Sequence, residues 1–394
     1  MVHILIGFAD ALPAPEVLFS LRRAGHTVSL FSRAPIGVLT RLSPKAVHVL
    51  PDPAKDAEGA VAGLARLMAA ADAPDLVMPL DDGGLWLTNA ALGLDRRIVG
   101  ATGKQVEIAL DKARQITAAR AAGLTVPETR LVCSAADLDA PLHLPAIAKP
   151  SDAIRLEGAG LTKGEARYLL SKSDVDSLRG AFTKASGPLL IQPLIAGQGQ
   201  GVFGFATPDG VVAWSGHRRL RMMNPHGSGS SACATWPPDE ELRASVARFL
   251  DAIGWRGPFM VELLRDHEGT AWFMELNGRM WGSLALARRQ GYEYPAWAVA
   301  LAADTEFQPP VSPSPGPEAL IMRHLGRDLL HLLFVLKGPR TALHRRHWPS
   351  FWTSLVAVLR PAPARRFYNY DPAAPGFFLW DALSTIWTFI RRRR

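Results

Sequence analysis

Two glutamates, Glu262 and Glu275, lie in the stretch VELLRDHEGTAWFMELN with a spacing that suits neighbouring strands of a hairpin. If the dipeptide Glu268-Gly269 forms a two-residue turn, pairing outward sets the two glutamates directly opposite each other. Two facing carboxylates repel by about 1 kcal/mol or more in the effective dielectric of a protein, so the pair needs a cation between them. The spacing therefore predicts a metal site.

The same pairing sets Leu264 against Phe273 and separates polar from apolar side chains. Alternation places Glu262, Glu275 and Asn277 on one face of the hairpin. The other face is expected to carry Val261, Leu263, Trp272, Met274 and Leu276. Carboxylate and amide oxygens suit Mg²⁺, which also takes waters and nucleotide phosphates. The alternative is a surface hairpin whose polar face is simply solvated.

This arrangement resembles the ATP-grasp superfamily, of the carboxylate-amine ligase type. In that family an acidic residue, a second about 12 or 13 positions later and an Asn two further on hold two magnesium ions, and Glu262, Glu275 and Asn277 match this pattern residue by residue. The resemblance implies ATP and Mg²⁺, or Mn²⁺ in its place, as cofactors. It also implies that Arg279 lies by the transferred phosphate or the activated acid, where a guanidinium stabilises developing oxyanion charge.

Two lysines match the family's phosphate-contacting lysines. Lys112 follows Asp111 at the start of a helix that ends in AAGLTVPET, and Lys149 stands at a strand end in AIAKP. Each would balance phosphate charge as a mobile point cation. For either lysine the alternative is a solvent-exposed surface position.

The segment IQPLIAG resembles the family's adenine hinge, where a backbone carbonyl and the N–H two residues later read the adenine edge. The resemblance assigns the carbonyl to Pro193, which keeps its acceptor although it lacks a donor, and the N–H to Ile195. This sequence departs from the family pattern at two places. Gln192 stands where the family often has a glutamate, and Gly199-Gln200 stands where the family has an acidic residue that contacts the ribose. The residues assigned to the nucleotide are Gln192, Pro193, Leu194, Ile195 and Gln200.

The family's flexible glycine-rich loop falls between Lys149 and the hinge. There SDAIRLEGAGLTKGEARYL supplies only Gly158, Gly160 and Gly164. Glycines let backbone amides approach phosphates closely, but three in a loop are equally expected from turn chemistry.

Arginines gather in HRRLRMMNPHGSGSSA, which is expected to form a strand end and a loop near the metals. Arg219 and Arg221 alternate along the strand, so they are expected to share a face and to clamp a substrate carboxylate in bidentate fashion. The alternative is that both are solvated surface charges. His226, beside prolines and glycines, needs no catalytic role.

The elements that position these residues predict an α/β fold with an N-terminal doubly wound domain at 1–100 and a two-lobed ATP-grasp domain at 101–307. The first domain reads as strand, helix and strand from VHILIGF to TVSLFSR, with a further helix DAEGAVAGLARLMAAA and strand LVMPL. Its first turn lacks G-x-G-x-x-G, which argues against a dinucleotide site. A proline-rich linker is predicted at 308–318, before a C-terminal helical, basic and aromatic extension at 319–394.

Charge is concentrated in that extension. Residues 321–394 carry 13 Lys and Arg against three Asp, a net charge of +10, while the whole chain carries +8, so the first 320 residues sum to −2. Because the excess of basic residues lies in the tail and the first 320 residues are slightly acidic overall, nucleic acid is not expected as a partner. Trp348, Trp352, Trp380 and Trp387 interleaved with arginines indicate amphipathic helices on an anionic membrane surface. The alternative is that these aromatics pack on the ligase core.

Composition is that of a globular protein, with 394 residues, 48% hydrophobic and 20% charged. The two cysteines, Cys133 and Cys233, offer neither a disulfide framework nor a four-cysteine zinc site, which favours a reducing cytoplasm. The N-terminus reads as a core strand rather than a signal peptide, and no apolar run approaches the roughly 20 residues that a membrane span needs.

Together these features predict an ATP- and Mg²⁺-dependent ligase that activates a small-molecule carboxylate as an acyl phosphate and joins it to an amine or similar nucleophile. Two alternatives remain open at this point. One keeps the nucleotide site but transfers the phosphoryl group to a hydroxyl, as a kinase does. The other is a membrane-associated nucleotide-binding protein on a decayed ligase scaffold.

Overall fold

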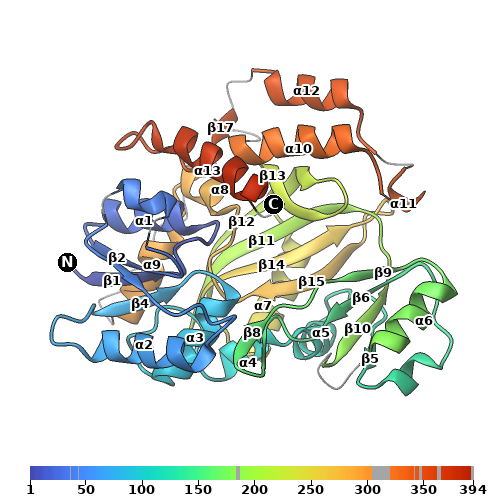
Figure 1. Ribbon diagram of the computed structural model, residues 1–394, viewed down its shortest axis with the longest axis horizontal. Coiled ribbons are helices and arrows are strands. Elements are labelled where there is room, and N and C mark those ends of the chain that lie inside the picture. The colour runs from blue at the N-terminus through green and yellow to red at the C-terminus, as the bar shows by residue number, and fades with distance from the viewer. Residues whose placement is uncertain are drawn as a thin grey trace.

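A computed structural model describes residues 1–35, 37–42, 44–182, 187–303, 320–340, 342–345, 348–361 and 365–391 (Figure 1). The predicted linker at 308–318 lies outside the described residues. The strands form sheets of four, four, seven and two strands, and helices cover the larger ones.

The N-terminal domain is the predicted doubly wound α/β unit. Its parallel sheet has the order β3-β2-β1-β4. Its elements are β1 (His3–Gly7), α1 (Ala14–Arg23), β2 (Thr27–Ser32), η1 (Val38–Leu42), β3 (Val47–Val49), α2 (Ala57–Ala69), β4 (Leu76–Pro79) and α3 (Asp82–Leu92). In β1, Ile4 and Ile6 pack on one side with α1, while Leu5 packs on the other with α2 and α3. The sheet is therefore buried on both faces, as its continuous apolar strands require.

The smaller of the next two lobes carries an antiparallel sheet with the order β5-β10-β6-β9. Its strands are β5 (Arg130–Val132), β6 (Ala146–Pro150), β9 (Arg167–Leu169) and β10 (Leu189–Pro193). A two-stranded hairpin, β7 (Arg155–Glu157) and β8 (Gly160–Thr162), extends from it. The lobe's helical elements are η2 (Ala135–Leu138) and α6 (Lys172–Ala181), while α4 (Lys104–Leu110) and α5 (Lys112–Ala121) precede it in the chain and pack beneath the larger sheet.

The larger lobe is built on a seven-stranded sheet with the order β15-β14-β11-β12-β13-β16-β17. Its first strands are β11 (Gln198–Thr207), β12 (Gly210–Asn224), β13 (Ser228–Thr235), β14 (Gly257–Arg265) and β15 (Ala271–Asn277), with helices α7 (Glu240–Ala252), α8 (Leu284–Arg289) and α9 (Tyr294–Ala302). The apolar side of α7 is buried beneath this sheet together with α5.

The C-terminal extension completes that sheet instead of forming a separate tail. Strands β16 (Ile321–Arg323) and β17 (Arg365–Phe367) pair at its edge, β16 with β13 and β17 with β16. The helices are α10 (Leu325–Lys337), α11 (Ala342–Arg345), α12 (Phe351–Leu359) and α13 (Phe377–Arg391). Helix α10 packs over β12 and β13 and also contacts α12 and α13, so the extension forms one end of the molecule (Figure 1).

Candidate active site

A cavity of about 930 Å³ lies where the N-terminal domain, both lobes and the C-terminal extension meet. Its walls include Asp81, Asp82, Lys163, Gln192, Pro193, Leu194, Ile195, His217, Arg219, Glu262, Met274, Glu275, Asn277, Arg279, Arg327 and Tyr368. Most of the predicted site residues are in this list. The structure therefore brings together groups that are far apart in the sequence.

The predicted pairing of Glu262 with Glu275 is confirmed, but the turn that joins their strands differs from the prediction. The carboxylate of Asp266 accepts hydrogen bonds from the backbone N–H groups of Glu268 and Thr270, which forms a longer loop than the predicted dipeptide. Such local bonding is typical of aspartate in turns. The strands consequently start one residue out of the predicted register.

A bulge at Met274 restores the register before the glutamates. Leu264 lies opposite Trp272, not Phe273, whereas Glu262 still faces Glu275. An extra residue in one strand shifts its alternation, so Met274 faces the cavity. The predicted apolar face is thus wrong for Trp272 and Met274, and Phe273 takes the buried position with Leu263.

Each glutamate already lies beside a cationic side chain from another element. Arg219 Nη2 lies 2.7 Å from Glu262 Oε1, and Lys112 Nζ lies 3.8 Å from Glu275 Oε2. Asn277 Nδ2 donates to the Met260 sulfur at 3.0 Å, which leaves its Oδ1 atom for another partner. The facing carboxylates are therefore partly neutralised by protein charges.

The two predicted lysines come from different elements, Lys112 from the start of α5, which packs against α7 and β15, and Lys149 from β6 of the smaller lobe. Asp111 caps α5 by accepting from the N–H groups of Ala113 and Arg114, and this cap directs the following Lys112 toward Glu275. Burial lowers the pKa of Lys149 on β6, while the charge of Glu275 opposes that shift. Both lysines are thus electrostatically coupled to the carboxylate hairpin.

The hinge segment lines the cavity at the end of β10. Gln192 Nε2 donates to Thr129 Oγ1 at 2.8 Å, and the Leu194 N–H donates to the Pro145 carbonyl at 3.0 Å, so the segment is held from both sides. Gln200, like Lys112 and Lys149, is not among the residues that line the cavity. Its Oε1 accepts from Arg265 Nε at 2.9 Å, because β11 turns this side chain away from the face that carries Glu262.

The N-terminal domain supplies an acidic residue that the sequence analysis did not single out. Asp82, at the start of α3, lies 3.1 Å from Arg279 Nε and 3.1 Å from Lys163 Nζ. Burial would raise the pKa of Asp82, but these two cations lower it to about 2. The DDGG sequence directly after a parallel strand was an available signal, because such strand ends commonly carry functional groups.

The β7–β8 hairpin, predicted as the glycine-rich loop, docks on the N-terminal domain. The Leu161 N–H donates to the Pro53 carbonyl at 2.7 Å, and a side chain at Gly160 would collide with the carbonyl of Ala54. Gly158 has a φ of +59° in the hairpin turn. A side chain at Gly164 would collide with the ring of Pro150, so all three glycines serve turn geometry or close packing.

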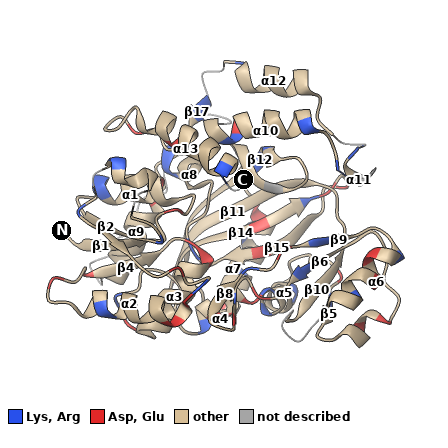
Figure 2. Ribbon diagram, viewed as in Figure 1, with Lys and Arg blue, Asp and Glu red and all other residues tan. Residues whose placement is uncertain are grey.

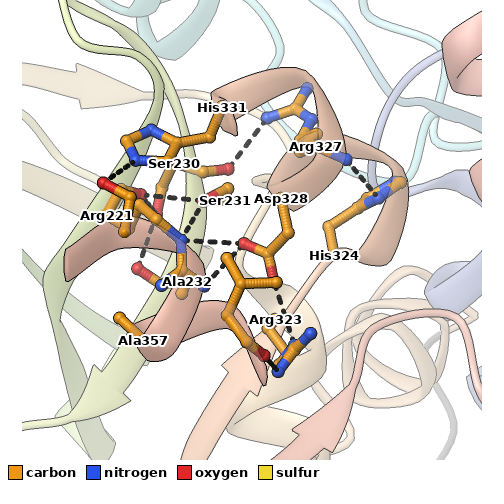
Figure 3. A network of polar contacts seen from close by, with 12 residues as sticks. Arg221, Ser230, Ser231, Ala232, Arg323, His324, Arg327, Asp328, His331 and Ala357 are labelled. Carbon is orange, nitrogen blue, oxygen red and sulfur yellow. Dashed lines mark hydrogen bonds and ion pairs between the residues drawn. The ribbon is translucent and has the colours of Figure 1, made fainter. Parts of the chain in front are cut away.

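The predicted shared face of Arg219 and Arg221 is wrong. Arg219 pairs with Cys233 and Arg221 with Ala232, so Leu220 is an extra residue on β12 and the two arginines point to opposite sides of the sheet. Arg219 lines the cavity, whereas Arg221 donates to Asp328 Oδ1 at 2.6 and 2.9 Å on the side covered by α10 (Figure 3).

His226 does not itself line the cavity, although its neighbour Gly227 does and the His226 carbonyl accepts a hydrogen bond from the lining residue Tyr168 at 3.0 Å. Its imidazole contacts Asn224 Oδ1 at 3.0 Å and accepts from the Arg340 N–H at 2.9 Å, and it packs against His344 and Trp348. These contacts agree with the expectation of a non-catalytic loop residue.

The C-terminal extension was predicted to be a separate region, but it contributes two residues to the cavity. Arg327 Nη1 donates to the Ser230 carbonyl at 3.1 Å (Figure 3), and no carboxylate of the described residues lies within 4 Å of it. The Tyr368 hydroxyl is buried beside the Cys233 thiol and has no oxygen or nitrogen partner among the described residues. The guanidinium of Arg327 therefore lines the cavity without a close carboxylate partner in the described part of the chain.

The chain has the ATP-grasp fold, as its likeness to solved structures shows. The L-amino acid ligase from Bacillus licheniformis is 18% identical, with 78% of each chain covered and a TM-score of 0.58. The N5-carboxyaminoimidazole synthetase from Staphylococcus aureus is 13% identical, with 83% of each chain covered and a TM-score of 0.62.

A third similar structure is the biotin carboxylase domain of 2-oxoglutarate carboxylase from Hydrogenobacter thermophilus, in complex with MgADP and bicarbonate. It is 14% identical, with 77% of this chain and 69% of that chain covered and a TM-score of 0.57. By sequence, no protein-family model and no curated protein matches the chain at a significant level.

Proposed function

We propose that this protein is an ATP- and Mg²⁺-dependent ligase that activates a carboxylate as an acyl phosphate and joins it to an amine. The observation that carries the proposal is the Glu262–Glu275 pair, facing a cavity that also holds Arg279 and the hinge, within an ATP-grasp fold. The similar structures, ligases and carboxylases of which one holds MgADP, support the reaction class. The free cysteines suit a cytoplasmic enzyme.

The nucleotide is proposed to lie along the cavity, with adenine against the Pro193 carbonyl and the Ile195 N–H. Lys112 and Lys149 then balance phosphate charge. The proposed metal ligands are the carboxylates of Glu262 and Glu275 and the side-chain oxygen of Asn277, which all line the cavity. This donor set fits Mg²⁺ or Mn²⁺, which complete their coordination with waters and phosphates. When bound, the cation neutralises phosphate charge and polarises the γ-phosphoryl group.

The chemistry then proceeds in two displacements. An oxygen of the substrate carboxylate attacks the γ-phosphorus, and the bond to the β,γ-bridging oxygen breaks to release ADP. The amine attacks the carbonyl carbon of the acyl phosphate, inorganic phosphate leaves, and the amine proton passes to phosphate or solvent. Arg279, held by Asp82, stabilises the developing oxyanion. Lys163, directly after the β7–β8 hairpin, contacts Asp82 at the cavity wall, and this contact is proposed to limit access of water to the intermediate.

Arg327 is proposed to bind a carboxylate of the acid or of the amine substrate. Its guanidinium faces the cavity, whereas that of Arg219 is engaged by Glu262. The Tyr368 hydroxyl offers a second donor beside it. A charge-assisted hydrogen bond between the Arg327 guanidinium and a substrate carboxylate contributes enough binding free energy to control the affinity for that substrate.

We therefore expect Arg327→Met to raise the KM of one organic substrate by roughly ten- to a hundredfold, because a charge-assisted hydrogen bond of about 1.5–3 kcal/mol is lost. The KM of ATP should stay within about twofold, since the hinge and lysines are untouched. Steady-state kinetics with each substrate varied in turn measures this. Arg120→Met, an exposed arginine on α5, is the matched control. Equal KM values in wild type and Arg327→Met would refute the assignment.

The proposed function is tested by an ADP-release screen across amino acids, hydroxy acids and amine acceptors, with products identified by mass spectrometry. ADP release that requires both an acid and an amine, with formation of an amide, is the expected result. A phosphorylated product without amine incorporation would identify a kinase instead. Absence of ADP release with every pair would contradict the ligase proposal.

A further inference from the structure

Large apolar side chains are exposed mainly on three helices of the C-terminal extension. More than half of the exposed large hydrophobics among the described residues lie there. They are Leu329, Leu333 and Leu336 on α10, Trp352, Val356 and Leu359 on α12, and Leu379, Trp380, Leu383, Trp387 and Ile390 on α13. Scattered exposed leucines are ordinary, but this concentration marks an interaction surface.

Within each helix these residues follow the helical repeat and form one outer stripe. On α12, Trp352, Val356 and Leu359 are 72%, 62% and 69% exposed and lie at successive helical turns. The inner side of the same helix is buried through Ser354 and Val358. The helices are therefore held on the protein by one face while a second apolar face points outward.

The exposed charge around these stripes has a single sign. All three carboxylates of the described extension are buried and paired: Asp328 is 0% exposed, Asp371 6% and Asp381 9%. Their partners include Arg221, Arg23 and His324 respectively.

The exposed charged groups of the extension are basic. They are Lys337, Arg340, Arg345, Arg360, Arg366 and Arg391, which follow the helices and the loops between them (Figure 2). Within the described part of the extension, the exposed apolar stripes are accompanied only by cationic groups, and this combination is complementary to a layer that offers both acyl chains and anionic headgroups.

We propose that α10, α12 and α13 form a docking surface for an anionic lipid bilayer, separate from the proposed ligase activity. The tryptophans and leucines lie at the headgroup boundary, and the arginines contact lipid phosphates. A second copy of the chain is a poorer occupant, because two surfaces with the same positive charge would repel each other. Attachment is peripheral, since no helix of the described residues is long and apolar enough to cross a membrane.

Vesicle co-sedimentation of the full chain tests this surface. Vesicles of phosphatidylcholine with 30% phosphatidylglycerol are compared with pure phosphatidylcholine at low and high salt. We expect binding to the anionic vesicles at low salt, at least about tenfold weaker binding at high salt, and little binding to the neutral vesicles. Failure to bind the anionic vesicles at low salt would overturn the proposal.

Paired serine variants locate the contact. Trp352→Ser/Val356→Ser should weaken partitioning by at least about tenfold through loss of inserted apolar area. Val49→Ser/Leu94→Ser, which removes apolar residues exposed by 50% and 76% on the N-terminal domain, should leave it unchanged. Circular dichroism verifies folding of both.

Equal partitioning of the two double variants would overturn the proposal. So would a dimer in sedimentation velocity that the Trp352→Ser/Val356→Ser change dissociates, because the surface would then bind a second copy. ADP release is measured in parallel and is independent of either result.

Discussion

Glu275→Gln is expected to reduce the rate of ADP release roughly 10²- to 10³-fold at saturating substrates. The change keeps the shape of the side chain but removes one of the two charges that would hold the cation, and it deprives Lys112 of its counter-charge. Losses of this size are typical when one preorganised electrostatic group is removed from a catalytic site. The measurement is coupled ADP release with the acid and amine pair found in the screen.

Glu268→Gln provides the matched control for this variant. Glu268 lies at the exposed tip of the same hairpin, and only its backbone N–H is used, by Asp266. It should therefore retain the wild-type rate within about twofold. A Glu275→Gln enzyme as active as Glu268→Gln would remove the metal assignment while leaving the fold untouched.

Asp328→Ala is expected to destabilise the protein by about 3–5 kcal/mol, the usual effect of removing one partner from a buried ion pair. Asp328 is completely buried and lies 2.6 Å from Arg221 Nη2 and 2.9 Å from Arg323 Nε (Figure 3). Its loss leaves two guanidiniums without a counter-ion beneath α10. Urea unfolding followed by circular dichroism gives the change in the free energy of unfolding.

Asp176→Ala is the corresponding control, because Asp176 pairs with Arg179 on an exposed helix face. Such surface pairs contribute about 0–1 kcal/mol. If Asp328→Ala were no more destabilising than Asp176→Ala, the buried network would not hold the extension on the sheet.

Local patterns predicted the main elements of the N-terminal domain. Continuous apolar strands and the helix between them identified its parallel sheet, because both depend on side-chain periodicity alone. The hairpin shows the limit of that reasoning. The Glu262–Glu275 pairing was right although the turn was one residue too short, because the bulge at Met274 compensates for the loop that Asp266 organises.

The error at Arg221 and the omission of Asp82 both involve contacts between distant parts of the chain. Arg221 is turned away from the cavity by a bulge and bound by Asp328, 107 residues later in the sequence. Asp82 reaches Arg279 across 197 residues. Neither ion pair can be recognised from the residues next to either partner in the sequence. The role of the extension was missed for the same reason, since β16 and β17 join the sheet only in the folded protein.

The most direct test of the central claim is a crystal structure with a non-hydrolysable ATP analogue and Mn²⁺, with data collected at the manganese absorption edge. The account predicts an anomalous peak between the carboxylates of Glu262 and Glu275, with the analogue's phosphates beside it and its adenine at Pro193 and Ile195. A nucleotide bound in this cavity with no manganese at the two glutamates, or with their side chains turned apart, would contradict it.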